Sequence, residues 1–143
     1  MWSLKHLALI ISEDIERLAA LNSAAVATDF TVNCIGSLNI ARDLIARYSN
    51  DYHLILIDGD SLGSETNART FLRGVQGNAP KSNTVIFTAA PASFAAFEPV
   101  VQVCTLEEAI ERMPRFKRDV MRFRSGPVKK PRRISPPVRE PSE

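Results

Sequence analysis

Short apolar runs alternate along this chain with longer segments in which apolar residues recur at helical spacing. Residues 7–11, 54–57 and 84–87 are almost wholly apolar, as is typical of strands that are buried on both faces of a parallel sheet. Residues 30–35 are rich in β-branched side chains, and residues 100–103 form another short apolar run. The pattern therefore predicts five strands.

The segments between these strands carry helix signals. Ala41, Leu44, Ile45 and Tyr48 recur at i, i+3, i+4 and i+7, which places them on one helical face after the N-cap candidate Ser37. Further helices are predicted at residues 14–27, around 68–75 and from 106 to 113. The last of these follows a capping box, Thr105 with Glu108, and we expect Pro114 to end or bend it.

Alternating strands and helices favour right-handed crossovers, which produce a parallel sheet covered by helices on both faces. The expected fold class is therefore α/β, with a doubly wound five-stranded parallel sheet. Only about ten residues separate Thr88 from the fifth strand. The connection there is too short for a full helix, so we expect its helix to be shortened or missing.

The charge changes abruptly near residue 111. Residues 1–111 hold seven Lys/Arg and thirteen Asp/Glu, whereas residues 112–143 hold eleven and three, which gives net charges of −6 and +8. Such asymmetry is typical of a folded body with a charged arm. We therefore predict a domain over residues 1–113 and a flexible, basic, Pro/Arg-rich tail over 114–143, mobile from Arg115 onward. Phe116, Val120 and Phe123 are the exception, since their spacing suits a short helix against the body or a partner.

Composition excludes several classes of protein. No apolar run reaches the ~18 residues that a membrane-spanning helix needs, and the N-terminal segment lacks the layout of a signal peptide. We therefore expect a cytoplasmic protein that is not transmembrane. The two cysteines, Cys34 and Cys104, are interpreted as reduced, buried thiols.

Polar residues follow three of the predicted strands. In parallel sheets, functional residues gather beyond the carboxyl ends of the strands. The residues at those ends are Ser12, Glu13, Asp14, Asp58, Asp60 and Thr88. The sequence therefore predicts an acidic cluster with a hydroxyl group beside it.

This ordered pattern resembles a two-component response-regulator receiver domain over roughly residues 5–113. The segments LALIISEDIERL, LILIDGDSLG and VIFTAA carry the resemblance. It implies a flavodoxin-like fold in which Asp58 is the candidate phospho-acceptor and Thr88 contacts the phosphoryl group. It also implies Mg²⁺ as a cofactor, with Glu13, Asp14 and Asp58 as candidate ligands, because carboxylate oxygens suit this hard cation.

The chain departs from the receiver pattern in four places. Ser12 stands where the first of two acids is usual, and Leu62 stands where a Pro is usual. No Lys follows the fifth strand, and the fourth helix is short or absent. The loss of the Lys removes a phosphate contact, so we interpret the chain as a degenerate receiver, or pseudo-receiver. The expected function is a non-catalytic signalling module that binds a protein partner, is not an enzyme and requires no cofactor.

Several alternatives stay open. The chain could be a phosphorylatable receiver that accepts a phosphoryl group on Asp58. It could also be a STAS-like regulatory domain, since Asp60-Ser61-Leu62-Gly63 resembles the phospho-serine loop of that family, although the leading strand-helix-strand half does not fit it. Asp58 could simply cap loop amides, and Glu13 and Asp14 could favour a helix N-terminus. The tail has five candidate roles: to contact nucleic acid, anionic lipid or an acidic protein surface, to fold back on the acidic body of the chain, or only to keep the protein in solution.

Overall fold

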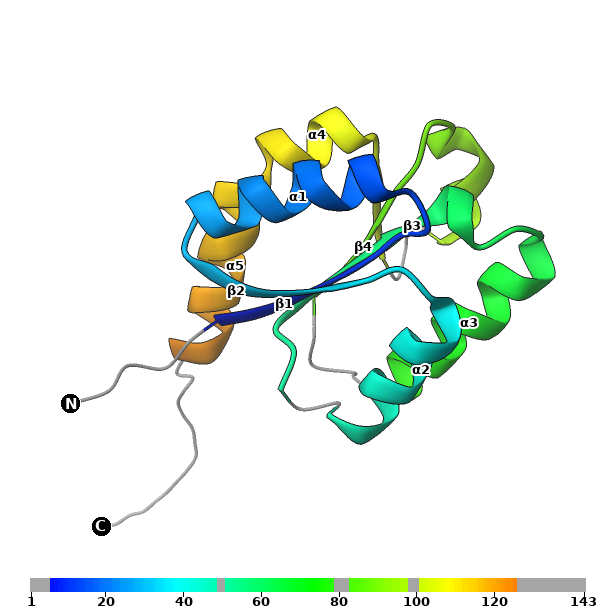
Figure 1. Ribbon diagram of the computed structural model, residues 1–143, viewed down its shortest axis with the longest axis horizontal. Coiled ribbons are helices and arrows are strands. Elements are labelled where there is room, and N and C mark those ends of the chain that lie inside the picture. The colour runs from blue at the N-terminus through cyan, green and yellow to red at the C-terminus, as the bar shows by residue number, and fades with distance from the viewer. Residues whose placement is uncertain (1–5, 49–50, 79–82, 98–100, 126–143) are drawn as a thin grey trace, which may run out of the picture.

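A computed structural model describes residues 6–48, 51–78, 83–97 and 101–125 (Figure 1). Five strands form one sheet in the order β2-β1-β3-β4-β5, and every neighbouring pair is parallel. The strands are β1 (His6–Ile11), β2 (Phe30–Ile35), β3 (Leu54–Asp58), β4 (Asn83–Phe87) and β5 (Gln102–Cys104). The predicted doubly wound, flavodoxin-like α/β fold is confirmed.

The helices form one layer on each face of the sheet (Figure 1). One layer contains α1 (Ile15–Ala27), α4 (Leu106–Glu111) and α5 (Met113–Ser125), and the other contains α2 (Leu38–Arg47) and α3 (Glu65–Asn78). Helix α1 begins after the N-cap Asp14, and α2 begins after the N-cap Ser37. Helix α4 begins at the predicted capping box of Thr105 and Glu108. Side-chain capping of this kind supplies partners for helix amides that have none within the helix.

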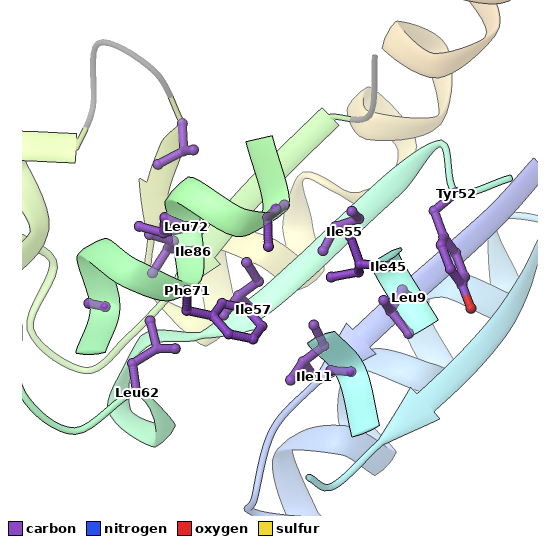
Figure 2. Close-up of a cluster of buried hydrophobic side chains, with 14 residues drawn as sticks. Leu9, Ile11, Ile45, Tyr52, Ile55, Ile57, Leu62, Phe71, Leu72 and Ile86 are labelled. Carbon is purple, nitrogen blue, oxygen red and sulfur yellow. The ribbon is translucent and has the colours of Figure 1, made fainter. Parts of the chain in front are cut away.

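Each face of the sheet buries its own hydrophobic cluster. Figure 2 shows the cluster beneath α2 and α3, where Phe71 and Leu72 pack onto Ile55 and Ile57. On the other face Leu21 packs with Leu54, Leu56 and Phe87, among other apolar side chains. All five residues of β3 are buried, because it is the central strand and helices cover both of its faces. Such a strand reads as a continuous apolar run.

Two connections contain a short 3-10 segment, and in the one between β4 and β5 this segment stands in place of an α-helix. The segment η1 (Gly59–Ser61) follows β3, and η2 (Pro91–Phe97) connects β4 to the last strand. The expectation that the fourth helix of the receiver pattern is shortened is confirmed by η2. The fifth strand begins at Gln102, two residues later than predicted.

The predicted boundary at residue 113 falls inside the packed structure. Phe116 is fully buried and Val120 is 3% exposed, and both belong to the hydrophobic cluster under α1. Lys117 Nζ donates a hydrogen bond of 2.6 Å to the backbone oxygen of Asp29 and lies 4.8 Å from the centroid of the Phe30 ring. The helix against the body that the spacing of Phe116 and Val120 predicted, as the exception to a mobile tail, is therefore present in α5. Residues 126–143 of the predicted tail lie outside the described residues.

Two further expectations concern the whole chain. Both cysteines are free, but Cys34 is exposed on the edge strand β2, so only Cys104 fits the interpretation of a buried thiol. Burial raises the pKa of the Cys104 thiol to about 11.

Within the described ranges, no helix is long and apolar enough to cross a bilayer.

Candidate functional site

The carboxyl ends of three adjacent strands bring the predicted polar residues together. Ile11 lies beside Ile57 in the sheet, and Asp58 lies beside Phe87. Ser12, Asp58 and Thr88 therefore meet at one edge of the sheet, and each is at least 99% buried. Polar side chains at this depth require hydrogen-bond partners.

The Asp58 carboxylate is satisfied on both oxygens. Oδ2 accepts a hydrogen bond of 2.6 Å from the Ser12 hydroxyl. Oδ1 accepts one of 2.9 Å from Arg17 Nη1 and one of 3.0 Å from the Asp60 amide. The last contact makes Asp58 the N-cap of η1, which was one of the alternatives for this residue.

Asp60, two residues further on, links the site to the next strand. Its Oδ1 accepts a 2.6 Å hydrogen bond from the Thr88 hydroxyl, and its Oδ2 accepts one of 3.0 Å from the Ala89 amide. Arg17 Nη1 also donates to Oδ2, at 2.8 Å. Although burial alone would raise the pKa of Asp60, these hydrogen bonds and the nearby guanidinium lower it below its ordinary value.

Arg17 is the cation at the centre of this cluster. It projects from the first turn of α1, and its Nη1 atom bridges Asp58 and Asp60. Its Nε lies 3.8 Å from Asp14 Oδ2. The hydrogen bond to Asp60 and the surrounding carboxylates raise the pKa of Arg17 above its ordinary value, despite partial burial. The guanidinium thus occupies the space between the two aspartates.

The three predicted Mg²⁺ ligands make different hydrogen bonds, although Asp14 and Asp58 share Arg17 as a partner. Asp14 Oδ1 accepts hydrogen bonds from the amides of Glu16 and Arg17, as an N-cap does. Glu13 is exposed, and its backbone amide donates to Ser61 Oγ. Asp58 is engaged as described above. In the part of the chain that the structure describes, no group of three or more His, Cys, Asp or Glu side chains is arranged to hold a metal ion.

The end of β5 lies beside this cluster. In the receiver pattern a Lys follows the fifth strand, but here Thr105 stands there and caps α4. A cavity of about 250 Å³ lies between Arg17, Thr88 and Thr105. Arg17 therefore contributes a cationic side chain to the lining of this cavity.

The sequence prediction missed Arg17. A local signal was present, because Arg17 lies three residues after Asp14 and side chains in a first helical turn point back towards the helix N-terminus. Its two main partners, however, lie 41 and 43 residues away in sequence. They come within reach because α1 begins just after β1, which lies beside β3 in the sheet.

Comparison with known proteins points to one fold. No family model and no curated protein sequence matches this chain. Solved structures do match. A receiver domain from Clostridium thermocellum is 15% identical with a TM-score of 0.61, covering 81% of this chain and 99% of its own. A response regulator from Thermotoga maritima is 13% identical with a TM-score of 0.63, covering 79% and 98%.

This chain has the receiver fold. An atypical orphan response regulator matches as well, at 15% identity and a TM-score of 0.59, covering 78% of this chain and 95% of its own. The observed strand order is that of the receiver fold, and the match covers nearly the full length of each of these structures. At these identities the match establishes the fold, so the function must be argued from the site.

Proposed function

We propose that this chain is a non-catalytic signalling module with a receiver fold that binds a protein partner independently of phosphorylation. The observation that supports this most strongly is the position of Arg17 between Asp58 and Asp60. In the receiver resemblance a divalent cation offsets the charge of the phospho-acceptor site. Here a side chain that cannot dissociate and stays protonated supplies that charge.

The contacts of Asp58 also oppose its use as a nucleophile. Its oxygens accept from Ser12, Arg17 and the Asp60 amide, and each of these bonds lowers the availability of a lone pair for attack on phosphorus. The sequence provides no lysine between Lys81 and Lys117 to hold a phosphoryl oxygen beyond the last strand. Phosphoryl transfer depends on such positioned positive charge.

One comparison agrees with this proposal. The atypical orphan response regulator that shares the fold is described as having a phosphorylation-independent regulatory mechanism. The STAS-like alternative, by contrast, has no support in the observed topology, because β1, α1 and β2 form the parallel leading unit that does not fit that fold.

We also propose that the basic C-terminal region contacts an anionic partner.

The experiment that tests this proposal measures whether the chain accepts a phosphoryl group. The full chain is incubated with Mg²⁺ and acetyl phosphate, and the intact mass is measured quickly at low temperature because acyl phosphates are labile. We expect no added phosphoryl group, while a phosphorylatable receiver treated in parallel gains one. A mass gain of one phosphoryl group that Asp58→Asn abolishes would instead establish the alternative, a phosphorylatable receiver.

A further inference from the structure

The Asp60 carboxylate joins three segments that are distant in sequence. It accepts hydrogen bonds from Arg17 at the start of α1, from the Thr88 hydroxyl at the end of β4 and from the Ala89 amide. Two of these three donors belong to the segment that leads into η2. The carboxylate is therefore the anchor to which that segment is attached.

A relay of hydrogen bonds extends from Asp60 into η2. The Thr88 hydroxyl donates to Asp60 Oδ1 at 2.6 Å and accepts from the Ala90 amide at 3.1 Å. The backbone oxygen of Ala90 in turn accepts from the Ser93 amide at 3.0 Å. Because Thr88 uses its hydroxyl as donor and acceptor together, its orientation fixes the first turn of η2.

Aromatic packing holds the same segment from the other side. A Cβ atom on Gly59 would lie 2.9 Å from the Phe94 ring, so the ring rests directly on the backbone of the residue next to Asp60. Phe97 lies beneath the Arg69 guanidinium, 5.2 Å from the ring centroid. The position of η2 is thus set by polar contacts at its start and by ring contacts further along.

We propose that Asp60 is a positioning residue that acts as a permanent internal substitute for a phosphoryl group. This inference rests on the proposed function. In the receiver resemblance, an anion formed on the strand-three Asp draws in the Thr that follows strand four, and a cation balances it. Here the Asp60 carboxylate accepts hydrogen bonds from the Thr88 hydroxyl and the Ala89 amide, and Arg17 is the cation that balances it.

The chemistry of the donors supports this substitution. A hydroxyl group, a backbone amide and a guanidinium are the donors that a phosphoryl group also binds, and each forms a stronger bond to an anion than to a neutral acceptor. Asp60 accepts from these three donors with both of its carboxylate oxygens. Because Thr88 is only 1% exposed, water competes little for the Thr88 hydroxyl. The η2 segment is therefore held in one arrangement without ligand or modification.

Amide hydrogen exchange of the full chain, resolved by NMR, tests the inference. In Asp60→Ala and in Thr88→Val, we expect the amides of Ala89, Ala90 and Ser93 to exchange at least about tenfold faster, since each variant removes an anchoring bond. Amides of the central strand β3 should keep their rates. Thr88→Ser retains the hydroxyl and should behave as the native chain, which separates anchoring from simple packing.

Two results would overturn the inference. One is unchanged exchange of the η2 amides in both variants, and the other is equal acceleration in Thr88→Ser and Thr88→Val. If Asp60→Ala destabilises the whole domain, the comparison of the two Thr88 variants decides alone. Phosphorylation of Asp58 by acetyl phosphate would overturn the proposed function, but it would not alter the exchange comparison, so the two failures are distinguishable.

Discussion

At the scale of single residues, Arg17 offsets part of the negative charge of Asp58 and Asp60. An ionised carboxylate as deeply buried as that of Asp58 is costly unless it is paired and hydrogen-bonded. A guanidinium suits this position because it offers several donors in fixed directions and stays charged. Ser12 completes the arrangement by donating to the oxygen that Arg17 does not contact. A carboxylate at position 12 would instead add a third negative charge to those of Asp58 and Asp60.

Replacement of Arg17 should be costly to the fold. In Arg17→Gln the buried Asp58 loses its charged partner, and we expect the free energy of unfolding to fall by about 1–3 kcal/mol in urea denaturation. The matched control is Arg47→Gln, because Arg47 pairs with Asp43 on the surface and both side chains are at least 70% exposed. That variant should change stability by less than about 0.5 kcal/mol. Equal effects of the two substitutions would contradict the assigned role.

Acid should weaken the Asp60 contacts. Burial alone would raise the pKa of Asp60, but its hydrogen bonds from Thr88, Ala89 and Arg17 lower it in the folded state. The folded state therefore binds fewer protons than the unfolded state. The contribution of Asp60 to the free energy of unfolding is present above its unfolded-state pKa of about 4, and it is lost as the pH falls through its lower pKa in the folded state. Asp60→Asn should show a shallower loss of stability between pH 5 and pH 2, measured by urea denaturation at each pH. Identical acid dependence would exclude Asp60 as a contributor.

At the scale of elements, α5 shows that the end of a helix is not the end of a domain. Pro114 was expected to end or bend the helix before it, and α4 does end at Glu111, but proline is also tolerated in the first turn of a helix, and Pro114 is the second residue of α5. The spacing of Phe116 and Val120 predicted the helix itself, but only the structure shows that its apolar face completes the cluster under α1. The strands and the helix caps were predictable because they follow from local patterns, whereas the order of the strands in the sheet was implied by the receiver resemblance. The bridge from Arg17 to Asp58 was not, because it depends on tertiary approach.

Truncating the buried face of α5 should destabilise the whole domain. Phe116→Ala removes a fully buried ring, and we expect a loss of about 3–5 kcal/mol in the free energy of unfolding. Met121 lies on the same helix but is 47% exposed, so Met121→Ala should change stability by less than about 0.5 kcal/mol. Thermal or urea denaturation followed by circular dichroism distinguishes the two. A small effect at Phe116 would restore the boundary at residue 113.

At the scale of the whole molecule, the charge asymmetry belongs partly to the folded domain. Residues 112–125 hold six Lys/Arg and one Asp/Glu, so they carry +5 of the +8 that follows residue 111. Most of this segment is α5, which packs against the acidic body of the chain. Arg115 and Arg118 are exposed on this helix. A basic surface is therefore present even without residues 126–143.

Removal of the last eighteen residues should show how much each basic region, α5 and residues 126–143, contributes to binding. A chain that ends at Ser125 retains α5 and should fold, but it should bind a DNA duplex more weakly than the full chain does. Fluorescence anisotropy over a range of salt concentrations should give a steeper salt dependence for the full chain, because more counterions are released. Equal binding by both chains would assign the interaction to α5. No binding by either would favour a protein partner.

Under the proposed function, the anchoring of η2 by Asp60 also determines how long a signal would last. A phosphoryl group is added by one reaction and lost by another, so its lifetime limits the state that it creates. A carboxylate that belongs to the chain cannot be hydrolysed away, and its contacts with Thr88 and Ala89 last as long as the fold does. If a partner recognises that arrangement, the strength of the response depends on how many copies of the protein are made and how quickly they are degraded.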